Sequence, residues 1–266
     1  MDTGRRQHDD THNDEDDVDF VNVEFDFSAP TEVDFQALKR LYQQLFYTHA
    51  PSLDIGALAD HTVRLAQDSG IGTVIKVDDL EQERDPYAVM SAVPLGTDAQ
   101  LRAADVVRVY LESQLARSAT AKPLLQLVQG ASAAKPLLFV LHERMINLPV
   151  PVVPPLLRML LNEWEEGRME HTPAAPAPSH VLFFSRAFSA DALEEGRANE
   201  DEPTGLAGAR KRKAFASHTH TFRFPVPRDA AESFEAPIFG RVMAVPYERL
   251  PSLLARLEEL WAPPQA

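Results

Sequence analysis

Apolar side chains recur along the chain at two spacings, which predict two kinds of secondary structure. Apolar and polar residues alternate over residues 19–27, which predicts an opening strand. Apolar residues three and four positions apart then predict a helix over residues 35–46, with Thr31 or Asp34 as its cap. A second helix is expected over residues 54–70, between an aspartate cap and a glycine stop. The chain is therefore expected to open as strand, helix, helix.

Two further strands are predicted where apolar and small residues alternate, at residues 71–77 and 87–95. Because a short acidic connection joins them, we expect the two strands to pair antiparallel. A long helix capped by Thr97 or Asp98 is expected next, and a short helical piece follows at residues 124–128. This part of the chain thus alternates paired strands with helices.

Residues 135–161 carry the most distinctive pattern of the chain. Residues 137–141 form an uninterrupted apolar run, which predicts a strand buried on both faces. A patch that begins with three polar residues, 142–147, follows where this strand is expected to emerge. The prolines of residues 149–155 exclude a helix interior or a central strand, because proline lacks an amide donor and pushes its predecessor toward extended geometry. A leucine-rich helix is then expected over about residues 154–166, with the following glycine as its stop.

The last third of the chain is expected to complete the sheet. Strands are predicted at residues 181–188, 215–224 and 239–245, and a final helix carries leucines at core spacing over residues 250–261. Residues 190–209 have few large apolar side chains, which predicts a long surface loop. The whole pattern predicts a mixed α/β fold.

Composition narrows the class of protein. The chain has 266 residues, of which 44% are hydrophobic, so it can bury the core of one large domain or two small ones. The absence of cysteine excludes disulfides, zinc-thiolate sites and cysteine nucleophiles, and it fits a reducing compartment such as the cytoplasm or nucleus. No apolar run reaches the roughly 18 residues of a membrane span. The polar, acidic amino terminus argues against a secretory signal.

The net charge of −14 disfavours direct binding to nucleic acid and favours a basic protein partner. Residues 1–17 are expected to form a disordered acidic tail, because the first 19 residues hold eight acids against two arginines. The tail either solubilises the protein or shields a basic client, and both interpretations stay open. Candidate contacts for such a client are Asp14, Glu15, Asp16, Asp17, Asp78, Asp79, Glu81, Glu83 and Asp85.

Partial motifs for catalysis or metal binding occur, and none is complete. His142 and Glu143 resemble the start of a zinc-protease motif, but that chemistry needs a second histidine where the chain has Ile146. His218 and His220 would share one face of a strand, yet the pattern offers no third ligand, so ordinary strand packing explains them better. No glycine-flanked serine elbow or phosphate-binding glycine-lysine loop occurs. The sequence therefore predicts no catalytic residue and no metal site.

Residues 141–157 resemble the signature of the BCCIP family, whose human members interact with a breast-cancer repair factor and a cyclin-kinase inhibitor. The matching positions are Glu143, Arg144, Ile146, Asn147, Pro149, Val150, Val153, Pro154 and Pro155. Stretches that look like further family landmarks follow the same order along the chain, at residues 18–20, 35–41, 72–78, 85–88 and 239–243. His142 stands where a serine is common, and residues 190–209 do not match the family pattern.

The resemblance implies a single domain over residues 18–266, with a flexible loop at about residues 189–214. It implies a fold similar to GNAT acetyltransferases, a mixed sheet flanked by helices, in a pseudo-enzyme. Such a protein would be a chaperone or adaptor that escorts a basic ribosomal protein in biogenesis of the large ribosomal subunit.

The resemblance also bears on transport. In fungi, family members support nuclear export of a phosphatidylinositol phosphate kinase, which implies nuclear transport receptors as partners and a location in nucleus and cytoplasm. Two alternatives stay open, a GNAT-type acyltransferase and a cell-cycle or DNA-repair scaffold.

The residues argue against a bound cofactor. An acetyltransferase of this fold binds the pyrophosphate of acetyl-coenzyme A on free backbone amides at a helix amino terminus. The nearest glycine-containing stretch, residues 129–134, lies before a strand instead of opening a helix. Pro154 and Pro155 would remove two amides at the start of the helix that follows the central strand. The sequence therefore predicts that no cofactor is bound.

Two short runs are candidate transport signals. The basic residues Arg210, Lys211, Arg212 and Lys213 suit an import receptor, or they are simply solvated charges of a polar loop. The series Leu250, Leu253, Leu257 and Leu260 resembles a leucine-rich export signal, although such stripes mostly pack on a core. The sequence leaves both alternatives open.

Overall fold

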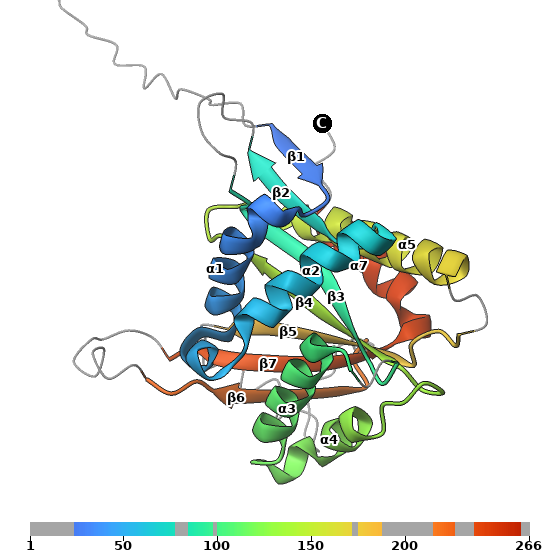
Figure 1. The fold of residues 1–266 in the computed structure, drawn as a ribbon. Helices are drawn as coiled ribbons and strands as arrows, with labels where there is room; N and C mark the ends of the chain where they lie inside the picture. Colours follow the sequence, from blue (N-terminus) through green and yellow to red (C-terminus); the bar gives the residue numbers. More distant parts are fainter. Residues whose placement is uncertain are drawn as a thin grey trace, which may run out of the picture.

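The fold is built on one mixed sheet of seven strands (Figure 1). The computed structural model describes residues 24–77, 85–97, 100–171, 175–187, 215–226 and 237–261. The strands are β1 (Phe25–Ser28), β2 (Thr73–Val77), β3 (Ala88–Leu95), β4 (Leu137–Arg144), β5 (His180–Ala187), β6 (His218–Arg223) and β7 (Phe239–Pro246). Their order is β1-β2-β3-β4-β5-β7-β6, and neighbours in this sheet are antiparallel except β4 and β5, which are parallel.

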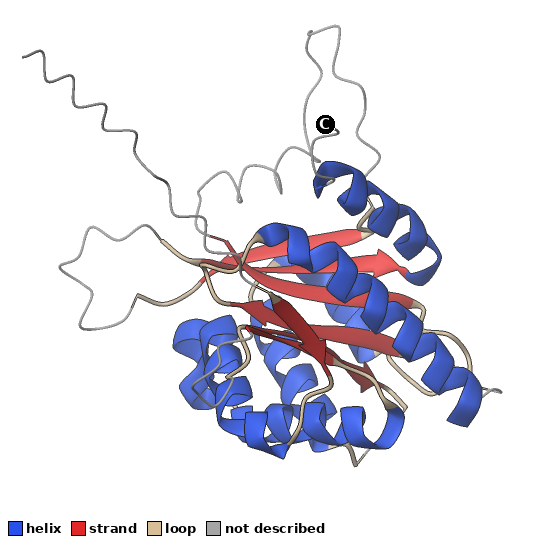
Figure 2. Cartoon of the chain, turned by 90° about the horizontal axis from the view of Figure 1, so that it is seen from above, coloured by secondary structure: helices blue, strands red, loops and turns tan. Residues whose placement is uncertain are grey.

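Helices cover both faces of this sheet (Figure 2). One face carries α1 (Phe35–Phe46), α2 (Ile55–Ser69), α3 (Arg102–Leu115) and α4 (Lys122–Gln129), and the other carries α5 (Val153–His171) and α7 (Leu250–Trp261). Short 3-10 turns also occur, namely η1 (Glu32–Asp34), η2 (Tyr47–Ser52), η3 (Ala119–Ala121), η4 (Val150–Val152) and η6 (Tyr247–Arg249). The expected α/β fold, a mixed sheet flanked by helices, is confirmed.

β4 lies in the middle of the sheet and contacts both helical layers. Alternate side chains of its apolar run, residues 137–141, pack into the two hydrophobic clusters on either side. All five of these residues are at most 1% exposed. The run is therefore a strand buried on both faces, as predicted, although the strand continues through the polar residues to Arg144.

Local capping contacts set the starts of η1, which leads directly into α1, and of α2. Asp34 is the N-cap residue of α1, one of the two caps predicted, but its side chain makes no capping bond to that helix. One Asp34 carboxylate oxygen accepts hydrogen bonds from the backbone N–H (2.8 Å) and the hydroxyl (3.1 Å) of Thr31. The other oxygen lies 2.7 Å from Nζ of Lys76 on β2. Asp54 accepts a backbone N–H bond of 3.0 Å in the first turn of α2, and Gly70 ends that helix with a left-handed φ of 65°. Both starts follow from side chains that are close in sequence.

The prediction that α5 ends at Gly167 is wrong, because the helix continues to His171. A Cβ atom at position 167 would lie 3.0 Å from Cδ1 of Ile71, so glycine here lets the helix approach the segment before β2. That contact joins residues far apart in the chain, and no local pattern reveals it. Pro154 and Pro155 lie in the first turn of α5, where proline is tolerated.

The start of α3 also differs from the prediction. Its N-cap is Leu101, whose side chain makes no capping bond, so Thr97 is not the cap. Asp98 lies outside the described residues, as do the acidic tail of residues 1–17 and the loop predicted at about residues 189–214. The single domain over residues 18–266 stays a prediction.

Candidate functional site

The sheet opens between β4 and β5. These strands pair from Leu137↔His180 to Val140↔Phe183, after which the end of β4 stays paired with β3 and the end of β5 with β7. The opening lies at the carboxyl ends of the parallel pair, where α/β folds place ligand sites. A cavity of about 550 Å³ lies there, lined by Gln44, Leu45, His142, Glu143, Arg144, Met145, Ile146, Ser185 and Arg186. This opening is the candidate functional site.

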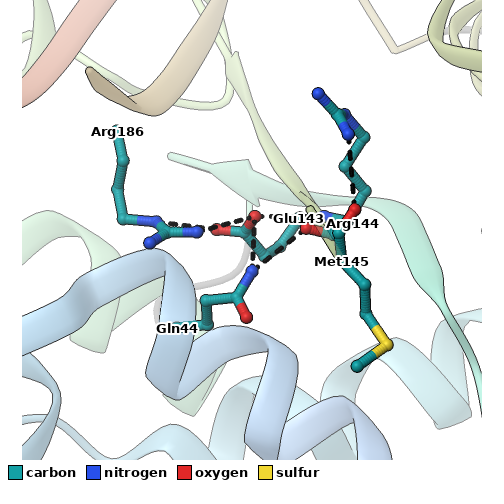
Figure 3. Close-up of polar contacts among 5 residues, drawn as sticks. All are labelled: Gln44, Glu143, Arg144, Met145 and Arg186. Atoms are coloured by element: carbon teal, nitrogen blue, oxygen red, sulfur yellow. Dashed lines mark hydrogen bonds and ion pairs between the residues drawn. The ribbon is translucent and has the colours of Figure 1, made fainter. Parts of the chain in front are cut away.

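An ion pair spans the opening (Figure 3). Arg186 on β5 donates from Nε and Nη2 to the two carboxylate oxygens of Glu143 on β4, each at 3.2 Å. Gln44 on α1 donates to the same carboxylate (3.1 Å) and to the carbonyl of Arg144 (3.0 Å). The carboxylate also accepts the backbone N–H of Arg144 at 3.1 Å. These donors offset the hydration that Glu143 loses, since this residue is only 8% exposed.

Arg144 turns away from this ion pair and holds the loop after β4. Its guanidinium donates to the carbonyls of Met145 (3.3 Å) and Leu148. The N–H of Met145 donates to the carbonyl of Tyr87 (2.8 Å), and the N–H of Leu148 donates to the carbonyl of Met145 (3.1 Å). Leu148 is 3% exposed, whereas Ile146 is 92% exposed. The loop is therefore fixed at both ends and presents an apolar side chain.

His142 precedes Glu143 on β4, so it points toward the other face of the sheet. Its Nε2 atom is enclosed and has no hydrogen-bond partner among the described residues. Burial lowers the pKa of the His142 imidazole to about 4, and the positive charge of Arg144 contributes to the same shift. His142 is therefore neutral near pH 7.

The structure brings part of the family-like signature to the opening. Residues 143–147 lie at the opening, and residues 149–153 lead through η4 into α5. Pro154 and Pro155 then occupy the first turn of α5 and contribute no N–H group. The helix that follows the opening thus offers fewer free amides than an ordinary helix start.

One of the nine candidate client contacts, Asp85, lies in the described part of the chain. Its carboxylate pairs with the guanidinium of Arg40 on α1, and both side chains are exposed. The other eight acids lie outside the described residues, as do the basic residues 210–213. All of these assignments stay predictions.

The paired histidines lie on β6, as expected. The ring of His220 is 6.3 Å from the ring of Phe222, and burial lowers the pKa of His220. Within the residues that the structure places, no group of three or more His, Asp or Glu side chains is arranged to hold a metal ion. His220 thus lies beside an aromatic ring, and Nδ1 of His218 lies 3.0 Å from the hydroxyl of Ser217.

Most of the leucine stripe of α7 packs on the core. Leu250 is buried, and Leu253 and Leu257 pack against the cluster that lies between the sheet and α5. Leu260 is 56% exposed. None of the helices in the described ranges has the length and hydropathy needed to cross a membrane.

Sequence reasoning missed Gln44 and Arg186, which complete the site from α1 and β5. They lie 99 and 43 positions from Glu143, so no local spacing connects them. Arg186 does carry one signal, because it is a charged residue within the apolar pattern of residues 181–188. A cation in a predicted buried strand needs an acidic partner, but the pattern along the chain does not show which acid that is.

We expect Glu143 and Arg186 to stabilise the fold as a pair. Glu143→Gln keeps the shape but removes the negative charge, and should lower the free energy of unfolding by roughly 2 kcal/mol, because Arg186 loses its carboxylate partner. Arg186→Met should cost a similar amount, and the double variant should cost less than the two single variants together. Urea unfolding measures all three.

The exposed pair of Arg108 and Asp105 supplies the control for this cycle. Asp105→Asn should change the free energy of unfolding by less than about 0.5 kcal/mol, since exposed ion pairs contribute little. Additive costs in the Glu143 and Arg186 cycle would show that the two side chains act independently.

His142 should make the protein less stable in acid. Its pKa in the folded protein, about 4, lies below the ordinary value of 6.5, so the unfolded chain takes up the proton first as pH falls. The contribution of neutral His142 is complete above pH 6.5 and is lost as pH falls toward 4. The variant His142→Gln should therefore show a smaller fall of Tm over this pH interval than the wild type. The difference corresponds to at most about 3 kcal/mol in the free energy of unfolding. An unchanged profile would mean that the folded protein accommodates the charged imidazole.

Comparison with known proteins relates these features to a family. The sequence profile of the BCCIP family matches residues 20–225. Protein BCP1 of Mycosarcoma maydis is 39% identical over 301 aligned positions, which cover 90% of this chain and 89% of that protein. The similarity therefore extends over nearly the whole of both proteins.

Solved structures are also similar to this fold. The crystal structure of BCP1 from Saccharomyces cerevisiae covers 94% of this chain and 93% of its own, with a TM-score of 0.57 at 22% identity. An agmatine N-acetyltransferase covers 84% of this chain and 100% of its own, with a TM-score of 0.36 at 10% identity, and nothing about activity follows from a similarity at that level. The profile match and the similarity to Protein BCP1 together show that the chain belongs to the BCCIP family.

Proposed function

We propose that the protein is a non-enzymatic chaperone or adaptor that escorts a basic ribosomal protein during assembly of the large ribosomal subunit. It would act in nucleus and cytoplasm and, through nuclear transport receptors, support export of cargo such as a phosphatidylinositol phosphate kinase. The observation that carries the proposal is the ion pair of Glu143 and Arg186, which spans the opening between β4 and β5 and binds these two charged groups of the cavity wall to each other. A binding role fits such a site better than a catalytic one.

The opening is poorly suited to acyl transfer from coenzyme A. A pyrophosphate group would compete with Glu143 for Arg186, and would leave a carboxylate that is largely removed from water without its cation. Pro154 and Pro155 withhold two amides from the first turn of α5.

Two acidic segments join the described fold at the edge where the sheet opens. The strand register brings Phe25 and Val77 to the same edge as Arg144, so residues 1–23 and 78–84 attach there. Residues 1–23 hold eight acids and two arginines, and residues 78–84 hold four acids and one arginine. Negative charge concentrated at one edge attracts and orients a basic client.

The proposed client contacts are Asp14, Glu15, Asp16, Asp17, Asp78, Asp79, Glu81, Glu83 and Asp85. The proposed contact with an import receptor is the basic run of residues 210–213. Both proposals use charges that the sequence places close together.

The full-length protein should retain one basic ribosomal protein from a mixture of large-subunit proteins. Retention should fall steeply as salt rises from about 50 to 500 mM, because salt screens exposed charges. Deleting residues 1–17 should weaken retention several-fold at low salt, and changing Asp78, Asp79, Glu81 and Glu83 to their amides should weaken it further. Immobilised protein and mass spectrometry of the retained fraction measure these effects.

A matched control changes four exposed acids on α2, α5 and η6 to amides, namely Asp68, Glu166, Glu170 and Glu248. This variant should retain the client as the wild type does. If retention of the client changed neither with salt concentration nor on deletion of residues 1–17, the electrostatic account would be contradicted. A cell-cycle or DNA-repair protein as the dominant partner would favour the scaffold alternative.

Acetyl-coenzyme A should give no saturable heat when it is titrated into the protein, even at millimolar concentration. The reason is that Arg186 is already paired with Glu143 and that two prolines in the first turn of α5 lack the N–H groups that would bind the pyrophosphate. An active acetyltransferase titrated in parallel provides the positive control. Saturable binding would favour the acyltransferase alternative.

A further inference from the structure

Residues 145–148, which we call the Ile146 loop, hold an apolar side chain in water on a fixed support. The loop is tied to the carbonyl of Tyr87 and to the buried Leu148, and the guanidinium of Arg144 binds two of its carbonyls. Ile146 is nevertheless 92% exposed, and Met145 is 42% exposed. The hydrogen bonds thus fix a loop whose most apolar residue contacts solvent.

Ile146 is the most exposed large apolar residue in the described ranges. Together with Met145 it borders the cavity at the opening of the sheet. A loop whose backbone is already fixed loses little backbone conformational freedom when a partner covers it. An apolar side chain held on such a loop beside a cavity is therefore suited to anchor a protein–protein contact.

The charges that line the cavity already have partners within the protein. Arg186 is bound to Glu143, and Arg144 is bound to carbonyls of the Ile146 loop. The surface next to Ile146 therefore suits an apolar group of a partner better than a charged one. Farther out, the acidic segments attach to the fold at this same edge and favour cations.

We propose that Ile146 and Met145 anchor a segment of a partner protein in which an apolar side chain lies between lysines or arginines. The apolar side chain packs on Ile146 and Met145 at the mouth of the cavity, and the flanking cations lie in the field of the acidic segments. This inference rests on the proposed binding of a basic client and adds an apolar contact to it. The charges speed association, and the apolar contact slows dissociation.

Two synthetic peptides rich in lysine and arginine test the proposal, one with a central leucine and one with serine in its place. The protein is labelled at the δ1 methyl group of each of its five isoleucines, and Ile146→Ser identifies the Ile146 signal. The leucine peptide should shift that signal at low salt. The serine peptide should bind roughly tenfold more weakly and leave the signal in place.

The Ile146→Ser variant keeps every charge, so it separates the apolar contact from the electrostatic one. It should bind the leucine peptide roughly tenfold more weakly than the wild type does, and the serine peptide about equally. The control is Val109→Ser on α3, a residue that is 60% exposed, and it should bind both peptides as the wild type does.

Equal binding of the leucine peptide to Ile146→Ser and wild type would overturn the anchor, while salt-dependent retention of a ribosomal client would still support the proposed function. Failure of both peptides to bind at low salt would also overturn it. So would an Ile146 signal that moves without peptide when residues 1–17 are deleted, since the acidic tail would then be the occupant. A signal that depends on protein concentration would identify a second copy of the chain as the occupant instead.

Discussion

The ion pair between Glu143 and Arg186 joins two halves of a sheet that separate at the middle. The halves, β1 to β4 and β5 to β7, share four backbone-paired positions, which end at Val140 and Phe183. Beyond these positions, side chains connect the two halves: the carboxylate of Glu143 on β4 accepts hydrogen bonds from Arg186 on β5 and from Gln44 on α1. Because a largely buried carboxylate needs its donors to offset lost hydration, this contact fixes the relative positions of α1, β4 and β5.

The same contact changes what the opening can do. Diverging parallel strands commonly leave room for a ligand, and an arginine there would ordinarily attract a phosphate. Here the arginine is matched by a carboxylate of the neighbouring strand, and Arg144 binds carbonyls of the loop that follows. The charged groups of the site thus serve the fold itself, and the site presents the apolar side chains of Ile146 and Met145 to solvent. The rim of the opening therefore offers more to a partner than its interior does.

The sequence predicted features whose causes are local. Asp54 caps α2 through a neighbour in the chain, Thr31 and Asp34 form the capping box of the short turn before α1, and the apolar run of β4 is buried on both faces as its pattern indicated. The errors come from contacts between distant residues. Gly167 lies inside α5, where it allows a close approach to Ile71, and does not end the helix, and β4 extends to Arg144 because β3 pairs with its polar end. A pattern read along the chain contains neither contact.

The candidate site also combines residues that the local sequence pattern indicated with residues that only the fold brings together. Its centre, Glu143 to Ile146, was visible as a signature, whereas Gln44 and Arg186 are joined to it by the fold alone. The chemical meaning of the signature also changed. As a motif, His142 and Glu143 suggested half of a metal site. In the fold, burial keeps His142 neutral and its Nε2 has no partner among the residues that the structure describes, while Glu143 is bound to an arginine.

In the proposed arrangement, acidic charge and an apolar anchor complement each other. Acidic segments alone would attract any basic protein, and the attraction would fall with salt. An exposed isoleucine alone would bind many apolar surfaces weakly, because one side chain buries little area. A partner segment gains from both the electrostatic attraction and the apolar contact only if it carries an apolar side chain with flanking cations. A partner that has only one of these features lacks the other contribution to binding. Selectivity for a basic client among the many basic proteins of a cell therefore requires the rigid loop as well as the charge.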